Sequence, residues 1–164
     1  MKRIAKFEWV SPTQFAADYT DTFGTGAVPA QPALPRRATA GSAGYDFYLP
    51  CDIRLEPSQS VKIPTGVRVR IEEGWVLKLY PRSGLGFKYR LQLNNTVGII
   101  DSDYYGADNE GHIQIKLTND SREGKVLELP AGAAFAQGVF VEYGITEDDN
   151  VAAERHGGLG STSK

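Results

Sequence analysis

Apolar and polar residues alternate along most of the chain after residue 43. Residues 67–71 and 113–117 alternate strictly, and residues 75–79 place Trp75, Leu77 and Leu79 on one face. Residues 134–143 form a longer apolar segment. Turn signals separate these runs, namely Pro64-Thr-Gly66, Glu73-Gly74, Arg122-Glu-Gly124 and Pro130-Ala-Gly132. Many short strands at this spacing predict an all-β domain, either an antiparallel barrel or a sandwich.

A helical period precedes these strands, in residues 11–24. The apolar face of this segment consists of Phe15, Tyr19 and Phe23. Ser11 can cap the helix, Pro12 suits its first position and Gln14 completes a Ser-x-x-Gln capping box. Gly24 is a suitable C-terminal stop. We therefore expect a short amphipathic helix whose aromatic face packs on the body of the protein.

The chain reads as one domain with a decorated N-terminus. Residues 25–42 are rich in Gly, Pro and Ala and predict a connector without helix or central strand. The last residues are polar and Gly-rich, which predicts a mobile arm. The expected organisation is a single domain, 1–164, with an N-terminal helical extension and linker (1–36), a β-barrel core (37–148) and a mobile C-terminal arm (149–164).

Composition narrows the class of protein. The 164 residues include 18 Lys and Arg against 20 Asp and Glu, and the resulting charge of −2 argues against a nucleic-acid partner. No apolar run approaches the ~20 residues of a membrane span, and the first residues lack a signal-peptide pattern. We expect a cytoplasmic protein without a membrane partner. The single Cys51 excludes an intramolecular disulfide and reads as a half-buried apolar residue.

Several familiar site motifs are absent from the chain or matched only in part. The chain has no Gly-x4-Gly-Lys-Ser/Thr phosphate loop, no Gly-x-Ser-x-Gly nucleophile and no zinc-type His or Cys spacing. Residues 101–106 match a calcium loop only in part, because Tyr105 and His112 occupy positions that need oxygen donors. Any catalysis must therefore rest on other groups.

Three segments carry candidate chemistry. Residues 81–84, Pro-Arg-Ser-Gly, can bind an anion or form an ordinary turn. Residues 95–106 place a carboxylate after a strand and before an aromatic residue. This order suits a general base next to a ring that packs on a sugar or nucleobase, or a simple hairpin with solvated acids. The amide of Asn95 there complements a pyrimidine edge or satisfies a turn. Residues 155–162 combine a cation, bare amides and hydroxyls, which suits a lid over a polyphosphate or a disordered tail.

Taken in order, five segments resemble the motifs of the trimeric dUTPase family. They are Ala43-Gly-Tyr-Asp-Phe47, Pro81-Arg-Ser-Gly-Leu85, Gly98-Ile-Ile-Asp-Ser-Asp-Tyr104 with Asn95 upstream, Phe135-Ala-Gln-Gly138, and the run from Arg155 to Thr162. The resemblance covers residues 38–162, and the N-terminal segment resembles extended bacterial and phage versions of the family. It implies a jelly-roll-like β-barrel, a homotrimer with shared active sites, and hydrolysis of dUTP to dUMP and pyrophosphate. This activity limits uracil in DNA and supplies dUMP for dTMP synthesis.

The same resemblance implies a role for each matching residue. Asp101 would activate the water that attacks the α-phosphorus, and Tyr104 would pack beneath the deoxyribose and exclude a 2′-hydroxyl. Asn95 and the hairpin backbone at Gly98 would read the uracil edge. The residues implied at the phosphates and in the closing arm are Arg82, Ser83, Gly84, Gln137, Arg155, Gly160, Ser161 and Thr162. The cofactor would be Mg²⁺ held mainly by the phosphates, with Asp46 in an indirect role through water.

The chain also departs from the family pattern. Leu159 stands where the family usually has Phe, which predicts weaker stacking on uracil, and a gain in affinity on Leu159→Phe. Tyr105 replaces the common Arg or Gln, and residues 106–112 look longer than usual. Two other functions stay open: a dCTP deaminase-like enzyme on the same fold, which would need a suitably placed Glu, and a non-catalytic binding or regulatory protein.

Overall fold

The strands dominate the fold, as the alternating pattern predicts. The computed structural model describes residues 1–153, 155 and 157. Its elements, in chain order, are β1 (Ala5–Trp9), α1 (Pro12–Phe23), β2 (Arg36–Arg37), β3 (Tyr45–Tyr48), β4 (Ile53–Leu55), β5 (Ser60–Pro64), β6 (Val67–Ile71), β7 (Trp75–Pro81), α2 (Ser83–Tyr89), β8 (Leu91–Leu93), β9 (Gly98–Ile100), the 3₁₀ helix η1 (Ser102–Gly106), β10 (Gln114–Asn119), β11 (Leu127–Leu129) and β12 (Ala134–Glu142).

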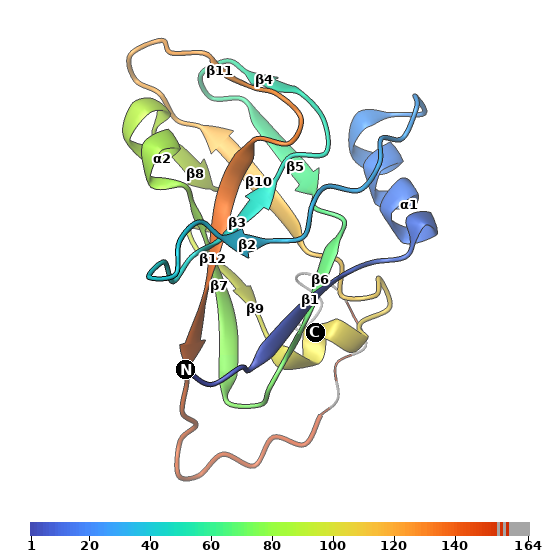
Figure 1. Ribbon diagram of the computed structural model, residues 1–164, viewed down its shortest axis with the longest axis vertical. Helices are drawn as coiled ribbons and strands as arrows, with labels where there is room; N and C mark the ends of the chain where they lie inside the picture. Colours follow the sequence, from blue (N-terminus) through green and yellow to red (C-terminus); the bar gives the residue numbers. More distant parts are fainter. Residues whose placement is uncertain (154, 156, 158–164) are drawn as a thin grey trace.

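The strands form antiparallel sheets around one core. The largest sheet has the order β2-β3-β12-β7-β9, and a second has the order β5-β10-β8. The pairs β1-β6 and β11-β4 complete the arrangement (Figure 1). These sheets do not close into one continuous barrel, but the all-β, jelly-roll-like class expected from the sequence is confirmed.

Alternation along each strand builds the core. In β6 the side chains of Val67, Val69 and Ile71 are buried, whereas that of Arg70 is exposed. The largest side chains sealed inside include Phe47, Phe135, Leu77, Ile113 and Leu117. Burial of these apolar groups is the main favourable contribution to folding.

The N-terminal extension is part of this body. The helix expected at residues 11–24 is confirmed as α1, and its Phe15 and Tyr19 are buried. Cys51 lies half-buried against the same aromatic cluster, as expected. Strand β1 was not expected. It pairs with β6, Phe7 opposite Val69, and so adds the first residues to the sheet system.

The capping box is right in one half and wrong in the other. The Ser11 hydroxyl accepts a hydrogen bond from the Gln14 N–H at 3.1 Å. The Ser11 N–H, however, donates to the carboxylate of Glu110 at 2.7 Å, and the Gln14 amide donates to Asp18 at 2.8 Å. A distant carboxylate is a stronger acceptor than the Gln14 amide, so it takes the capping bond.

The segment after β7 also differs from the expected turn. The chain continues into the seven-residue helix α2. Its C-cap is Arg90, whose φ of 50° lies in the left-handed region. Gly84 and Gly86, both poor helix formers, hide this helix in the sequence. No helix in the described part of the chain is long and apolar enough to cross a membrane.

Candidate active site

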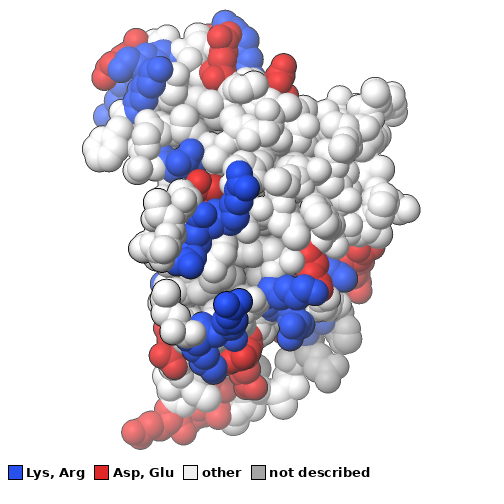
Figure 2. Space-filling model, in the orientation of Figure 1, with Lys and Arg blue, Asp and Glu red and all other residues white. Residues whose placement is uncertain are grey.

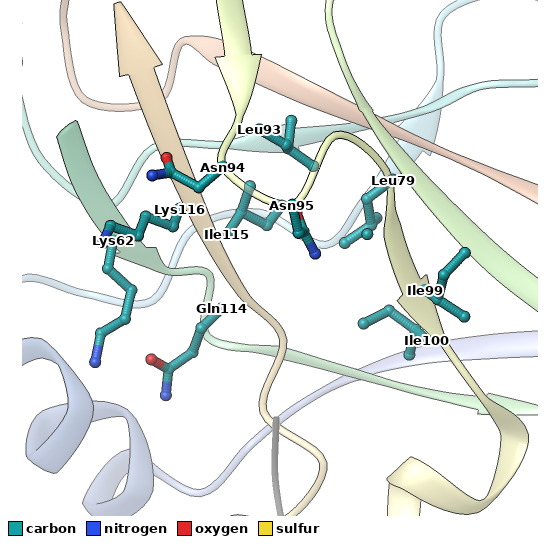
Figure 3. Close-up of a pocket in the computed structure, with 11 residues that line it drawn as sticks. Lys62, Leu79, Leu93, Asn94, Asn95, Ile99, Ile100, Gln114, Ile115 and Lys116 are labelled. Atoms are coloured by element: carbon teal, nitrogen blue, oxygen red, sulfur yellow. The ribbon is translucent and has the colours of Figure 1, made fainter. Parts of the chain in front are cut away.

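A pocket of about 380 Å³ lies between the segment from β8 to β9 and strands β5 and β10. The hairpin that the resemblance implies here is not formed within this segment, because β8 pairs with β10 and β9 pairs with β7. Figure 3 shows Asn95 between the apolar residues Leu79 and Leu93 and the polar wall formed by Lys62, Gln114 and Lys116. The neighbouring Asn94 is held by the Thr118 hydroxyl at 2.8 Å. Among the described residues, none hydrogen-bonds the side-chain amide of Asn95. That amide is therefore available to a ligand in the pocket.

Gly98 lets β9 approach β7 closely. A Cβ atom at this position would stand 2.9 Å from the Leu79 Cβ, closer than real Cβ contacts. Gly98 also lines the pocket. Its backbone therefore forms part of the pocket wall and limits the space for a ligand. A flat, polar-edged ring fits such a wall of bare backbone and apolar side chains.

Asp101 follows β9 directly, and its side chain is 47% exposed. Arg155 of the same chain covers it, with Nη2 2.7 Å from Asp101 Oδ2 and Nε 2.9 Å from Asp103 Oδ1. The guanidinium also lies 5.9 Å from the centre of the Tyr104 ring. One arginine thus bridges two carboxylates and lies over the ring of Tyr104, the residue after Asp103.

Tyr104 is more enclosed than its implied role suggests. The residue is only 2% exposed, its hydroxyl donates to the His112 carbonyl at 2.7 Å and it accepts from the Asn109 amide at 2.9 Å. Burial raises the pKa of this phenol above its ordinary value of 10. A sugar that packs on this face of the ring must take the place of the Arg155 guanidinium.

A second group of the expected site residues gathers where β3, β12 and β7 meet. Gln137 of β12 pairs with Asp46 on one side and Tyr80 on the other. The Arg82 guanidinium lies 3.2 Å from the Asp46 carboxylate. Ser83 and Gly84 begin α2 beside them and are exposed. Figure 2 shows basic side chains in the middle of this face, over β2 and β3, where Arg36 and Arg37 form β2. This face can attract a polyphosphate.

The two groups are not brought together within one chain. Ile100 pairs with Leu77, so Asp101 lies near the start of β7, whereas Arg82 follows its end. Five residues of strand separate these positions, a distance of roughly 16 Å. Figure 1 shows the same separation between α2 and the segment after β9. Leu159, Gly160, Ser161 and Thr162 lie outside the described residues.

The sequence interpretation missed the polar wall of the pocket. Lys62 and Lys116 are direct partners in the β5–β10 register, and Gln114 shares the same face two residues away. Alternation in residues 113–117 places the polar side chains there, opposite the buried Ile115. It could not show that this face lies beside residues 93–100.

Comparison with known proteins points to the same family as the sequence motifs. The family model described as dUTPase matches residues 30–163. The chain belongs to the dUTPase family. The match begins after β1 and α1, so these two elements lie outside the part that this dUTPase shares with the family model.

Similar proteins cover most of this dUTPase chain. The deoxyuridine 5′-triphosphate nucleotidohydrolase of Lactococcus lactis is 39% identical over 132 residues, 79% of this chain and 87% of the relative. The enzyme of the same name from Paraburkholderia phymatum is 35% identical over 139 residues, 80% of this chain and 89% of the relative.

Solved structures agree. The dUTPase from Streptococcus mutans is 34% identical, with a TM-score of 0.64 over 86% of this chain and 98% of that one. A mutant dUTPase from phage phi11 of S. aureus, whose structure is described as showing the coordination of a structural Mg(II) ion, shares the fold at 21% identity and a TM-score of 0.64. It covers 92% of this chain and 98% of its own.

Proposed function

We propose that this dUTPase hydrolyses dUTP to dUMP and pyrophosphate with Asp101 as the general base. One observation carries the proposal: the half-exposed Asp101 carboxylate follows the strand whose first residue, Gly98, lines the pocket with Asn95. The names of the relatives and their identities of 35–39% support the same substrate. In a cell this reaction would limit uracil in DNA and supply dUMP for dTMP synthesis.

The reaction needs one activated water. Asp101 accepts a proton from a water molecule as the water oxygen attacks the α-phosphorus. The bond between that phosphorus and the bridging oxygen to the β-phosphorus breaks, and pyrophosphate leaves with the electron pair. In-line attack depends on holding water and phosphorus together, which is the main contribution expected from the protein.

The same side of the molecule recognises the base and the sugar. The Asn95 amide can donate to and accept from the uracil edge, and the backbone at Gly98 restricts the space beside it. The deoxyribose takes the place on Tyr104 that the Arg155 guanidinium holds in the free chain. A 2′-hydroxyl would meet the ring there, so UTP is rejected.

The phosphates are held by the second group. Arg82, Ser83 and Gly84 bind the β-phosphate and Gln137 the α-phosphate region, while the arm from Arg155 through Leu159 and Gly160 to Ser161 and Thr162 closes over base and γ-phosphate. Among the described residues, no cluster of three or more His, Cys, Asp and Glu could hold a metal. Single carboxylates such as Asp46 fit Mg²⁺ that keeps its waters, as a hard cation bound to phosphates does. The ion would neutralise charge that develops on the phosphates.

The separation of the two groups supports a shared site. Asp101 and Arg82 lie at opposite ends of β7, too far apart to act on one triphosphate within a chain. In a homotrimer, one site can combine Asp101 of one chain with Arg82 of another chain, so the two residues need not meet within a single chain. Mixing Asp101→Asn with Ser83→Ala, unfolding and refolding the mixture together, should then restore part of the activity; no recovery would contradict a shared site.

The deaminase alternative lacks its acid. The first glutamate after Asp101 is Glu110, and both of its carboxylate oxygens accept hydrogen bonds from Ser11. Glu110 therefore faces the N-terminal helix rather than the pocket, whose lining does not include it.

Pyrophosphate release from dUTP, UTP, dCTP and dTTP with Mg²⁺ tests the proposal. We expect release from dUTP alone, and a loss of at least ~100-fold in Asp101→Asn, since general-base contributions are of this order. Ammonia from dCTP would instead support a deaminase. No reaction with any of the four would favour a binding or regulatory protein.

A further inference from the structure

The N-terminal extension contacts the segment that carries Tyr104 at three separate points. The pairs are Glu8 with Tyr105 at 2.6 Å, Ser11 with Glu110 at 2.6 and 2.7 Å, and Asp18 with His112. The first member of each pair belongs to residues 1–29, which precede the family match, and the second to residues 102–112. The longer stretch noted in the sequence is residues 106–112; its part after η1, residues 107–112, is here called the 107–112 loop.

His112 is the buried centre of these contacts. The residue is 0% exposed, and its Nε2 accepts a hydrogen bond from the Gly66 N–H at 2.8 Å. The remaining ring proton must therefore be on Nδ1, which donates to the Asp18 carboxylate. Asp18 is oriented in turn by the Gln14 amide at 2.8 Å. A carboxylate on α1 thus fixes the orientation of the imidazole.

The backbone of His112 holds Tyr104. Its carbonyl accepts the Tyr104 hydroxyl at 2.7 Å, and Asn109 of the same loop donates to that hydroxyl at 2.9 Å. Gly111 lies against η1 so closely that a Cβ there would stand 2.6 Å from the Tyr104 carbonyl oxygen. A displacement of the 107–112 loop would therefore move the Tyr104 ring.

The loop also carries backbone strain next to its anchor. Glu110 has a φ of 59°, in the left-handed region that residues other than glycine enter only at a cost in free energy. Its carboxylate is held by the N–H and hydroxyl of Ser11, the cap of α1. A strained conformation persists only where its surroundings impose it, and here the extension imposes it.

We propose that Asp18, His112 and Glu110 are positioning residues for Tyr104, through which the N-terminal extension sets the discrimination between deoxyribose and ribose. This inference rests on the proposed function, because it needs Tyr104 to pack on the sugar. Rejecting one hydroxyl by contact requires the ring to be fixed to a fraction of an ångström, and a misplacement of about 1 Å can change rates by ~100-fold.

The test compares Asp18→Ala with two controls. Asp18→Asn keeps an oxygen acceptor for His112 Nδ1, so it should rescue part of the effect. Leu127→Ala opens a cavity in β11, at the opposite end of the molecule from η1, and supplies a destabilised protein with the Tyr104 contacts intact (Figure 1). Each variant is assayed for kcat and KM on dUTP and on UTP.

Asp18→Ala should lower the ratio of kcat/KM for dUTP to that for UTP by about tenfold or more, mainly through faster turnover of UTP. Leu127→Ala should lower Tm without changing this ratio. Amide hydrogen exchange of residues 102–112 should rise in Asp18→Ala and stay near wild type in Leu127→Ala.

Two outcomes overturn different claims. An active wild type with an unchanged ratio in Asp18→Ala would overturn the positioning role alone. A wild type inactive on dUTP would overturn the proposed function, and unchanged exchange of residues 102–112 in Asp18→Ala would then also overturn the mechanical link between the extension and Tyr104.

Discussion

Arg155 Nη2 lies 2.7 Å from Asp101 Oδ2, so the arm of the free chain covers the carboxylate that is proposed to activate water. The Asp101 side chain is 47% exposed, and ion pairs of this kind contribute about 1 kcal/mol or less. A triphosphate with Mg²⁺ can therefore displace the contact at little cost. The same guanidinium is then available to the γ-phosphate.

Arg155→Ala should weaken binding of a nonhydrolysable dUTP analogue by roughly 10- to 100-fold, because a charge-assisted hydrogen bond contributes about 1.5–3 kcal/mol. Binding of dUMP, which has no γ-phosphate, should change little. Calorimetric titration of both ligands checks the difference. Arg54→Ala is the matched control, since Arg54 of β4 pairs with Glu128 of β11 and with Glu56, remote from the site. Equal losses for the two ligands would contradict the γ-phosphate role.

Acid should destabilise the protein through His112. Burial lowers the pKa of this imidazole below its ordinary value of 6.5, although Asp18 opposes the shift. Below about pH 6.5 the unfolded chain therefore binds a proton that the folded chain does not. The free energy of unfolding should fall as the pH drops, by up to about 1.4 kcal/mol per pH unit.

Urea unfolding between pH 8 and pH 5 checks this slope at a fixed protein concentration. His112→Gln keeps a polar side chain but does not titrate, so most of the slope in this range should disappear. His156 is present in both proteins and cancels in the comparison. Parallel pH profiles for wild type and His112→Gln would contradict a neutral, buried His112.

Local periodicity was enough to find α1 and the strands β6, β7, β10 and β12, because each of these patterns lies within a few consecutive residues. It failed for α2, whose glycines conceal a helix, and for β1, whose five residues pair with β6 about sixty positions away. The prediction of the α1 cap was wrong in part for the same reason. The Ser11 N–H donates to the carboxylate of Glu110, a partner that no local rule can supply.

The candidate site shows the same limit. Motif order located Asp101, Asn95 and Gly98, and the structure places Asn95 and Gly98 at one pocket with Asp101 just beyond it. Sequence spacing could not show that Arg82 and Asp101 lie at opposite ends of β7, since this depends on strand register. Nor could it show that Asp18 reaches His112.

The contact of Ser11 with Glu110 should contribute measurably to stability. Ser11→Ala removes the hydroxyl that accepts from Gln14 N–H and donates to Glu110. Loss of a helix cap costs about 1–2 kcal/mol, which corresponds to a fall in Tm of roughly 2–8 °C for a chain of this size. Calorimetry checks this against Thr13→Ala, an exposed position in the same turn of α1. Equal Tm values for the two variants would show that Ser11 contributes nothing beyond its neighbours.

Two glycines give opposite expectations for the same substitution. In Gly98→Ala the new Cβ would stand 2.9 Å from the Leu79 Cβ, so β9 must move away from β7. Overpacking of this kind costs about 1–3 kcal/mol, and the displaced strand should also weaken binding of a dUTP analogue. In Gly86→Ala the Cβ meets no described atom within 4 Å, and α2 should gain about 0.5–1 kcal/mol because alanine loses less chain entropy. Tm and the Kd of the analogue, measured side by side, separate the two effects. If Gly98→Ala lowered Tm but bound the analogue as tightly as wild type does, the uracil could not lie against this strand, because the wall that the substitution displaces would not be touching the base.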